Sequence, residues 1–177
     1  QRLYFTVRPL RFEQVWFRLW RKLYPLRKLN GINATTTPLA WVWSAPEVVK
    51  SSIEDEHHVC FLNLRGEIRS AANWNDSCFE KLWLYNLHYF DDLNAINSLS
   101  RKSAQFSLVK RWIMENPPVS GNGWEPYPLS LRLVNWVKWY NRAEIESVEI
   151  INSIEQQAEA LSKQLEYHIL GNHLFAN

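Results

Sequence analysis

Asn172 and His173 are adjacent polar residues in an otherwise apolar stretch, ILGNHLF, near the end of the sequence. Amide and imidazole groups donate hydrogen bonds. Solvated polar side chains are not expected in such a stretch, so the pair is a candidate for a functional role. The alternative is structural, because a histidine on an apolar helix is often a hydrogen-bonded core residue.

Two other segments combine aromatic rings with polar side chains. In LWLYNLHYFDDLN these residues are Tyr85, Asn86, His88 and Tyr89, and in GNGWEPYPLSLRLVNW they are Trp124, Glu125, Tyr127, Arg132 and Asn135. Aromatic faces stack on sugar rings, while the polar groups hydrogen-bond hydroxyls and pair with a carboxylate or sulfate. Both segments interrupt the helical patterns around them, and together they predict a substrate-binding surface for carbohydrate.

The second of these segments also makes a geometric prediction. Its Pro and Gly residues form a rigid frame, which is expected to present Trp124, Glu125, Tyr127 and Arg132 on one concave surface rather than between helices. In the alternative interpretation, Trp124 and Tyr127 plug the ends of helices, and Glu125 pairs with Arg132 across a helix start. For His88, packing or orientation inside the protein is slightly favoured over contact with a ligand.

Other polar clusters predict no metal and no cofactor. His57 and His58 stand beside Glu54, Asp55 and Glu56. This pattern is typical of a solvated acidic turn rather than of a metal site.

The elements that position these residues are mainly helices. Apolar residues at three- and four-residue steps predict helices from Phe12 to Tyr24, from Ser103 to Asn116, from Pro128 to Arg142, and from Val148 past Leu165 for about six turns. A weaker pattern between His57 and Arg69 predicts a β-hairpin with its turn at Arg65 and Gly66. Short connections favour antiparallel helical hairpins, so the fold class is mainly all-α, with a small β-hairpin and an irregular N-terminal segment.

Composition agrees with an aromatic helical domain. The 177 residues include ten Trp, seven Tyr and eight Phe but only five Gly, which predicts either a rigid helical core or a surface for stacking. The formal charge is +2 and basic residues occur throughout the chain, which disfavours nucleic-acid binding. No apolar run is long enough to span a membrane. Cys60 and Cys78 allow one disulfide but do not identify a compartment.

Three motifs, LWLYNLHYFDDLN, GNGWEPYPLSLRLVNWVKW and LEYHILGNHLFAN, occur in this order. Through them the chain from about Phe61 onward resembles the N-terminal domain of the heparinase II/III family of polysaccharide lyases. The helix from Phe12 to Tyr24 is similar to the leading segment of that family. The resemblance implies an incomplete α/α toroid that begins in residues 53–177, after an N-terminal helix and connection in residues 1–52. The rest of the toroid and a β-sandwich are expected to follow.

The resemblance also implies β-elimination on a uronate-containing polysaccharide, such as a glycosaminoglycan, as substrate partner. Asn172 and His173 match the positions that neutralise the uronate carboxylate, and Tyr85, Tyr89 and Tyr127 map to the substrate groove. The family's tyrosine base is expected beyond Asn177, so the isolated chain is expected to be inactive.

Two other functions stay open. A uronyl C5-epimerase abstracts the same proton with the same groups, and a toroid that lost its chemistry would only bind glycans. Related lyases are commonly exported, which favours a periplasmic or extracellular location, although these residues contain no visible signal peptide. The oligomeric state is not predicted.

Overall fold

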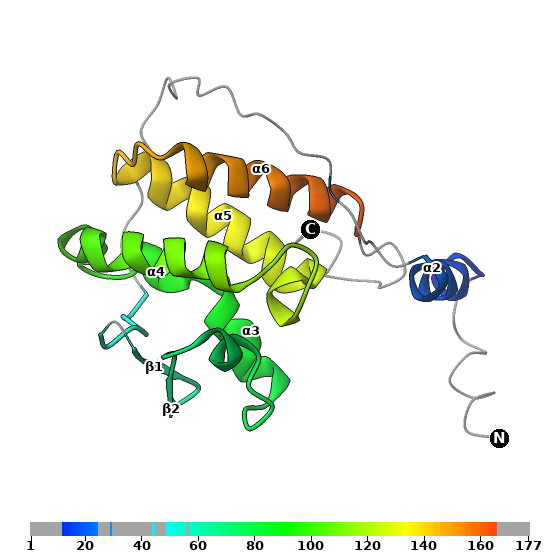
Figure 1. Cartoon of the computed structure of the whole chain (residues 1–177), viewed down its shortest axis with the longest axis horizontal. Helices are drawn as coiled ribbons and strands as arrows, with labels where there is room; N and C mark the ends of the chain where they lie inside the picture. The colour runs from blue at the N-terminus through cyan, green and yellow to red at the C-terminus, as the bar shows by residue number, and fades with distance from the viewer. Residues whose placement is uncertain (1–11, 25–28, 30–43, 45–48, 56, 166–177) are drawn as a thin grey trace.

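The computed structural model describes residues 12–24, 29, 44, 49–55 and 57–165, and within the first helix only some of the side chains. The α-helices and strands are α2 (Phe12–Leu23), β1 (His58–Phe61), β2 (Leu64–Glu67), α3 (Lys81–Tyr89), α4 (Lys102–Glu115), α5 (Pro126–Arg142) and α6 (Val148–Ser162). Short 3₁₀ turns join them: η1 (Ala71–Asn75), η2 (Asp91–Asn94), η3 (Ser98–Arg101) and η4 (Asn122–Trp124). The described chain is mainly helical with one small sheet, which confirms the predicted class (Figure 1).

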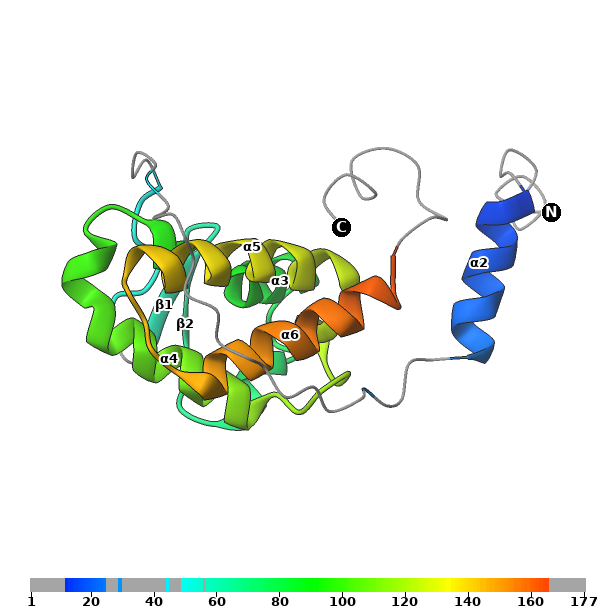
Figure 2. The same cartoon turned by 90° about the horizontal axis from the view of Figure 1, so that it is seen from above.

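Helices α4, α5 and α6 alternate in direction, and α6 lies along α5 in both ribbon views (Figure 1 and Figure 2). Helix α5 contacts both α3 and α6, while α4 also contacts α6. Proline determines where two of these helices begin or end. Pro117 and Pro118 follow α4, and Pro126 occupies the first position of α5, where a missing N–H leaves no hydrogen bond unmade. The predicted α4 is confirmed, and α5 begins two residues earlier than predicted.

The core of this helical body is built from indole rings. Trp112 is fully buried, and its ring centroid lies 5.4 Å from that of Trp136 and 5.8 Å from that of Trp124. Phe90 contacts Trp136 edge-on, with centroids 5.5 Å apart. Edge-to-face packing of this kind fixes the relative positions of the helices that carry the rings. Many of the tryptophans therefore form the rigid core that the composition allowed.

The β-hairpin is present, but its predicted turn is wrong. Val59 pairs with Gly66, so the loop consists of Leu62 and Asn63, both with positive φ (54° and 61°). Two positive φ angles are what a tight two-residue hairpin requires. Gly66 instead lies in β2 under Trp83, where an added Cβ would meet the indole at 2.5 Å. Gly66 is thus needed for the close approach of the Trp83 indole and not for the turn of the hairpin.

Two helical predictions need correction. The segment LWLYNLHYF forms α3 rather than interrupting the helical pattern, and α3 ends where Phe90 adopts a left-handed conformation with φ 57°. Helix α6 ends at Ser162, earlier than its apolar repeat suggested, because the N–H of Gln164 bonds the carbonyl of Leu161 at 2.8 Å and tightens the last turn. The cysteines do not pair: Cys60 and Cys78 are both free thiols.

Candidate functional site

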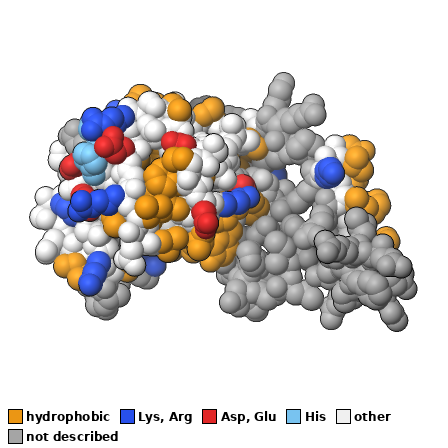
Figure 3. Space-filling view, turned by 90° about the horizontal axis from the view of Figure 1, so that it is seen from below, with side chains coloured by type: hydrophobic (Ala, Val, Ile, Leu, Met, Phe, Trp, Pro, Cys, Tyr) orange, Lys and Arg blue, Asp and Glu red, His pale blue; other side chains and the backbone are white. Residues whose placement is uncertain are grey.

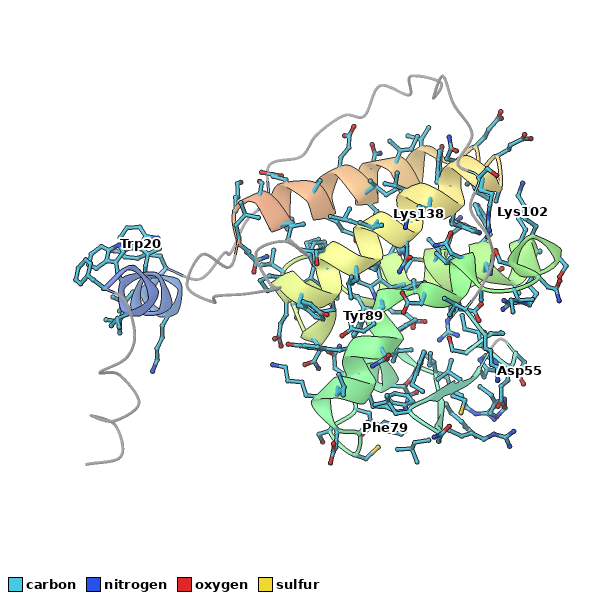
Figure 4. All side chains as sticks on the ribbon, turned by 180° about the vertical axis from the view of Figure 1, so that it is seen from behind. Trp20, Asp55, Phe79, Tyr89, Lys102 and Lys138 are labelled. Carbon is cyan, nitrogen blue, oxygen red and sulfur yellow. The ribbon has the colours of Figure 1, made fainter. Side chains whose placement is uncertain are left out.

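Helix α3 and the beginning of α5 together form one aromatic and polar surface. We call it the α3–α5 face, and its residues are Lys81, Tyr85, Tyr89, Glu125, Tyr127 and Asn135. Figure 4 labels Tyr89 where the two helices meet. The face joins the two segments that the sequence singled out, and five of its six residues belong to the predicted substrate-binding set.

Glu125 anchors one end of the face. It is the residue before Pro126, with an extended backbone, and its carboxylate accepts a hydrogen bond from the Tyr85 hydroxyl. The Lys81 ammonium lies 2.8 Å from the same carboxylate oxygen and 5.3 Å from the centroid of the Tyr85 ring. The carboxylate thus ties the first turns of α3 to the start of α5.

Tyr89 lies in the middle of the face, where it is mostly buried, with 7% of the residue exposed. Its ring centroid lies 6.5 Å from that of Tyr85 and 6.0 Å from that of Tyr127. Burial, with Tyr127 and Asp91 nearby, raises the pKa of Tyr89 to about 12. The phenol therefore stays protonated at neutral pH, where it can donate a hydrogen bond but cannot serve as a general base in this state.

Asn135 closes the other end of the face. Its amide nitrogen donates to the backbone oxygen of Tyr89 at 3.0 Å and to the Asp91 carboxylate at 2.6 Å. Its side-chain oxygen accepts from Asn94 at 3.2 Å. Partial burial raises the pKa of Asp91, although the bond from Asn135 and the charge of Lys138 both oppose this rise. Because both amide hydrogens are used inside the protein, Asn135 positions α5 against the end of α3.

His88 lies in the core and not on the α3–α5 face. Trp112 donates from Nε1 to His88 Nδ1 at 3.0 Å, so the ring carries its hydrogen on Nε2, which donates to the Trp74 carbonyl at 3.0 Å. Burial, together with the charge of Arg132, lowers the pKa of His88 to about 3. The imidazole is neutral and held on both sides, which confirms the packing interpretation.

Arg132 is fully buried, 0% exposed, beneath the face. Its guanidinium lies 3.9 Å from the centroid of the Trp112 ring, and it donates from Nε to Gln157 at 2.8 Å and from Nη1 to the Gly123 carbonyl at 2.7 Å. Within the described part of the chain no carboxylate pairs with it. Burial lowers the pKa of this guanidinium, yet arginine keeps its charge in proteins. Arg132 is thus a cation held by neutral groups and aromatic rings.

The prediction of one concave surface is therefore wrong for two of its four residues. Trp124 is 3% exposed and donates from Nε1 to the carbonyl of Asn116 at 3.3 Å, so it plugs the C-terminal end of α4. Arg132 lies in the interior between helices. The alternative ion pair between Glu125 and Arg132 is also wrong, because Glu125 pairs with Lys81. Glu125 and Tyr127 remain on the face, half-buried.

The remaining predicted residues lie elsewhere. Asn86 is half-buried on α3 and donates to the carbonyl of Leu82 at 2.8 Å, one turn back, rather than toward the face. Asn172 and His173 lie outside the described residues, and their roles stay predictions. A pocket of about 200 Å³ opens beside Glu54, Asp55, Arg101 and Gln105, and no residue of the predicted substrate-binding set lines it.

Sequence reasoning missed two residues that matter to this arrangement. Lys81 lies one turn before Tyr85 on α3, and that four-residue spacing was the available indication. Gln157 is a polar residue three positions after Ile154 on the apolar side of α6, where an amide needs a buried partner. Its partners are Arg132 and Ser153.

The α3–α5 face can stack on flat apolar surfaces and donate hydrogen bonds from phenols, and the charge of Lys81 offsets that of Glu125. These are properties of a binding surface. Comparisons of the chain with models of protein families, with curated proteins and with solved structures find no match.

Proposed function

We propose that this chain is the N-terminal part of a polysaccharide lyase that cleaves a uronate-containing polymer by β-elimination. In this proposal its alternating helices form the first part of an α/α toroid, and the α3–α5 face belongs to the substrate groove. Support comes from the three motifs that resemble the heparinase II/III family and from the helical body in which two of those motifs meet.

The observation that carries the proposal is the contact between two motifs that are 40 residues apart. The Tyr85 hydroxyl bonds the Glu125 carboxylate across that separation, and Asn135 bonds the Tyr89 carbonyl. Each motif supplies aromatic rings to the same surface. A shared surface is what a sugar-binding interpretation of the two motifs requires, whereas two unrelated structural segments would not need one.

The proposed chemistry divides between binding and proton transfer. Tyr85 and Tyr127, both half-buried, would stack against sugar rings and donate to hydroxyls, while exposed Lys81 offsets the charge of Glu125 beside the acidic polymer. A base then removes the proton beside the uronate carboxylate. The electron pair forms a carbon–carbon double bond as the bond to the leaving oxygen breaks, and that oxygen takes up a proton to become a hydroxyl of the departing sugar. Asn172 and His173 would donate to the carboxylate while its charge increases.

The high pKa of Tyr89, about 12, fits this division of roles. A protonated phenol serves the binding step, and the base is proposed to come from beyond Asn177. Tyr89 is therefore not assigned to proton abstraction.

The test is turnover of a panel of uronate polymers by the full-length protein that contains this chain, followed by ultraviolet absorbance of the unsaturated product. Asn172→Ala and His173→Ala should each lower kcat by about 10²-fold with an unchanged melting temperature, since one such donor contributes roughly 3 kcal/mol in the transition state. A lowered melting temperature with unchanged kcat would mean that these residues are structural.

The α3–α5 face has its own test in the same protein. Tyr127→Ala should raise KM about tenfold or more, since a lost bonding partner for the sugar is worth roughly 1.5 kcal/mol or more. Met114→Ala is the matched control, because Met114 is exposed on α4 away from the face. Inverted uronate without absorbance would identify an epimerase, and binding without turnover would identify a glycan-binding protein.

A further inference from the structure

Helix α2 presents large apolar side chains to solvent. The exposed fractions of Phe12, Trp16, Leu19, Trp20, Leu23 and Tyr24 all lie between 46% and 78%. Isolated exposed apolar residues are normal, but a contiguous row of six marks a surface that another phase or molecule covers. Figure 2 shows α2 beside the body formed by α3–α6. Figure 3 shows hydrophobic side chains, in orange, on the described part of α2.

The exposed side chains form an ordered row. Phe12, Trp16, Trp20 and Tyr24 follow one another at four-residue steps, with ring centroids 6.3, 6.0 and 4.3 Å apart. Figure 4 labels Trp20 within this row. Trp and Tyr combine an apolar ring with a polar N–H or O–H group, and they concentrate where hydrocarbon meets water.

The segment that contains α2 is strongly basic, although the chain as a whole is nearly neutral. Residues 1–30 contain eight of the 20 Lys and Arg but only one of the 18 Asp and Glu, Glu13. Helical spacing of about 100° per residue places Lys22 on the side of the helix away from Trp20 and Tyr24, which are two residues before and after it. Lys22 is exposed. An aromatic side and a basic side on one helix are typical of peptides that lie in a membrane interface.

We propose that α2 binds the surface of an anionic lipid bilayer, with its aromatic row among the headgroups and its basic side toward the lipid phosphates. The helix has 12 residues, a length of roughly 18 Å, which is too short for the roughly 30 Å hydrocarbon core. No helix of the described residues is long and apolar enough to cross a membrane. The binding mode is therefore lateral.

The positive charge favours lipid over a second copy of this chain, because two such basic segments repel each other at close range. It does not by itself exclude nucleic acid. Leu19 and Leu23 in the exposed row favour lipid, since aliphatic side chains gain little against a phosphate backbone.

The connection to the rest of the protein is short. Leu29 packs on the hydrophobic core, five residues after Tyr24, which ends the aromatic row. Five residues span at most about 18 Å. Bound α2 would therefore hold the helical body close to the bilayer.

The experiment is co-sedimentation of the full-length protein with vesicles of phosphatidylcholine, alone or with about a third phosphatidylserine, at low and high salt. We expect binding to the anionic vesicles, at least tenfold weaker binding to neutral ones, and loss of binding at high salt. The double substitution Trp16→Ala/Trp20→Ala should weaken binding about tenfold or more. Lys22→Ala should weaken it about fivefold, while Lys50→Ala, an exposed control before β1, should not change it.

Several results would overturn the proposal. Absence of vesicle binding by the folded full-length protein would show that another segment of the chain covers the row. Self-association that the double substitution abolishes would identify a second copy as the occupant. Binding to duplex DNA that exceeds vesicle binding and also depends on Lys22 would identify nucleic acid. Because no variant touches the α3–α5 face, lyase activity on a soluble substrate should stay unchanged, which separates this test from that of the proposed function.

Discussion

His88 is a single core residue that makes the stability of the protein depend on pH. In the folded state its pKa is about 3, and in an unfolded chain it returns to about 6.5. Between these values the unfolded chain binds a proton that the folded protein does not. The stabilisation from neutral His88 is therefore complete above pH 6.5 and is lost as pH falls toward 3.

We expect the free energy of unfolding to fall by about 2 kcal/mol from this residue alone between pH 7 and pH 5. His88→Gln should remove most of this dependence, because an amide can accept from Trp112 and donate to Trp74 without titrating. Urea unfolding at the two pH values measures the difference. His58→Gln is a control of opposite sign: His58 is half-buried beside Asp55, and the hydrogen bond with Asp55 raises the pKa of His58, so its stabilisation is complete below pH 6.5 and is lost as pH rises through the higher folded pKa. An equal slope in the His88 variant and the wild type would contradict this account.

The neutral surroundings of Arg132 lead to a second prediction at this scale. Gln157→Leu removes the acceptor of the Arg132 Nε–H and should cost about 2–3 kcal/mol of stability. Gln157→Glu supplies a counter-charge and should cost less at pH 7. The difference between the two variants should shrink as pH falls below about 4.3, where the new carboxyl group protonates in the unfolded chain. Denaturant titrations at pH 7 and pH 4 test this, and the His88 contribution cancels because both variants contain it.

At the scale of elements, the turn after α4 contains a strained residue. The N–H of Ser120 bonds the carbonyl of Pro117 at 3.3 Å, which places Pro118 and Val119 at the centre of the turn. Val119 has φ 63°, a left-handed conformation that a β-branched side chain disfavours and that glycine adopts freely.

Val119→Gly should therefore raise the free energy of unfolding by about 0.5–1 kcal/mol. Ala104→Gly, at an exposed position inside α4, should lower it by about 1 kcal/mol and serves as a control of opposite sign. Thermal unfolding of the two variants distinguishes relief of strain from a general effect of glycine. A less stable Val119→Gly variant would show that the side chain contributes packing that outweighs its strain.

The elements that the sequence predicted well have one apolar side and a proline at one end, as α4 and α5 do. Helix α3 was not predicted because His88, a buried polar residue, breaks the apolar pattern from which helices are read. The hairpin turn was misplaced because Gly66 was interpreted as a turn residue. Glycine occupies this position because the indole of Trp83 leaves no room for a Cβ. Contacts between distant segments decided both cases, and local patterns do not contain them.

The candidate site was predictable in composition but not in geometry. Both motifs were recognised as belonging together, and Tyr85 and Glu125 do meet. Residue type does not show which side of α5 faces inward, so Arg132 was expected in a groove although its neighbours bury it. An arginine held by a glutamine and a carbonyl lacks the carboxylate partner by which a buried arginine is usually recognised.

At the scale of the whole molecule, one aromatic core extends from Val59 to Ala160 and includes contributions from β1, α3, α4, α5 and α6. Leu29 packs against the same core. The α3–α5 face is therefore supported by the entire described body rather than by two helices alone. Substitutions that weaken the core should disturb the face even when they lie far from it.

The contacts of Arg132 have a consequence for the rates of folding and unfolding. Its partners are the carbonyl of His88, 44 residues away, the carbonyl of Gly123, nine residues away, and Gln157, 25 residues away. These groups come together only when α3, η4, α5 and α6 have all assembled, and closing such long loops comes late in folding. The guanidinium then leaves water in the last steps. Gln157→Leu should accordingly speed unfolding and leave the refolding rate nearly unchanged in stopped-flow experiments. The contacts of the buried guanidinium would thus determine the unfolding rate and, through it, the lifetime of the native protein.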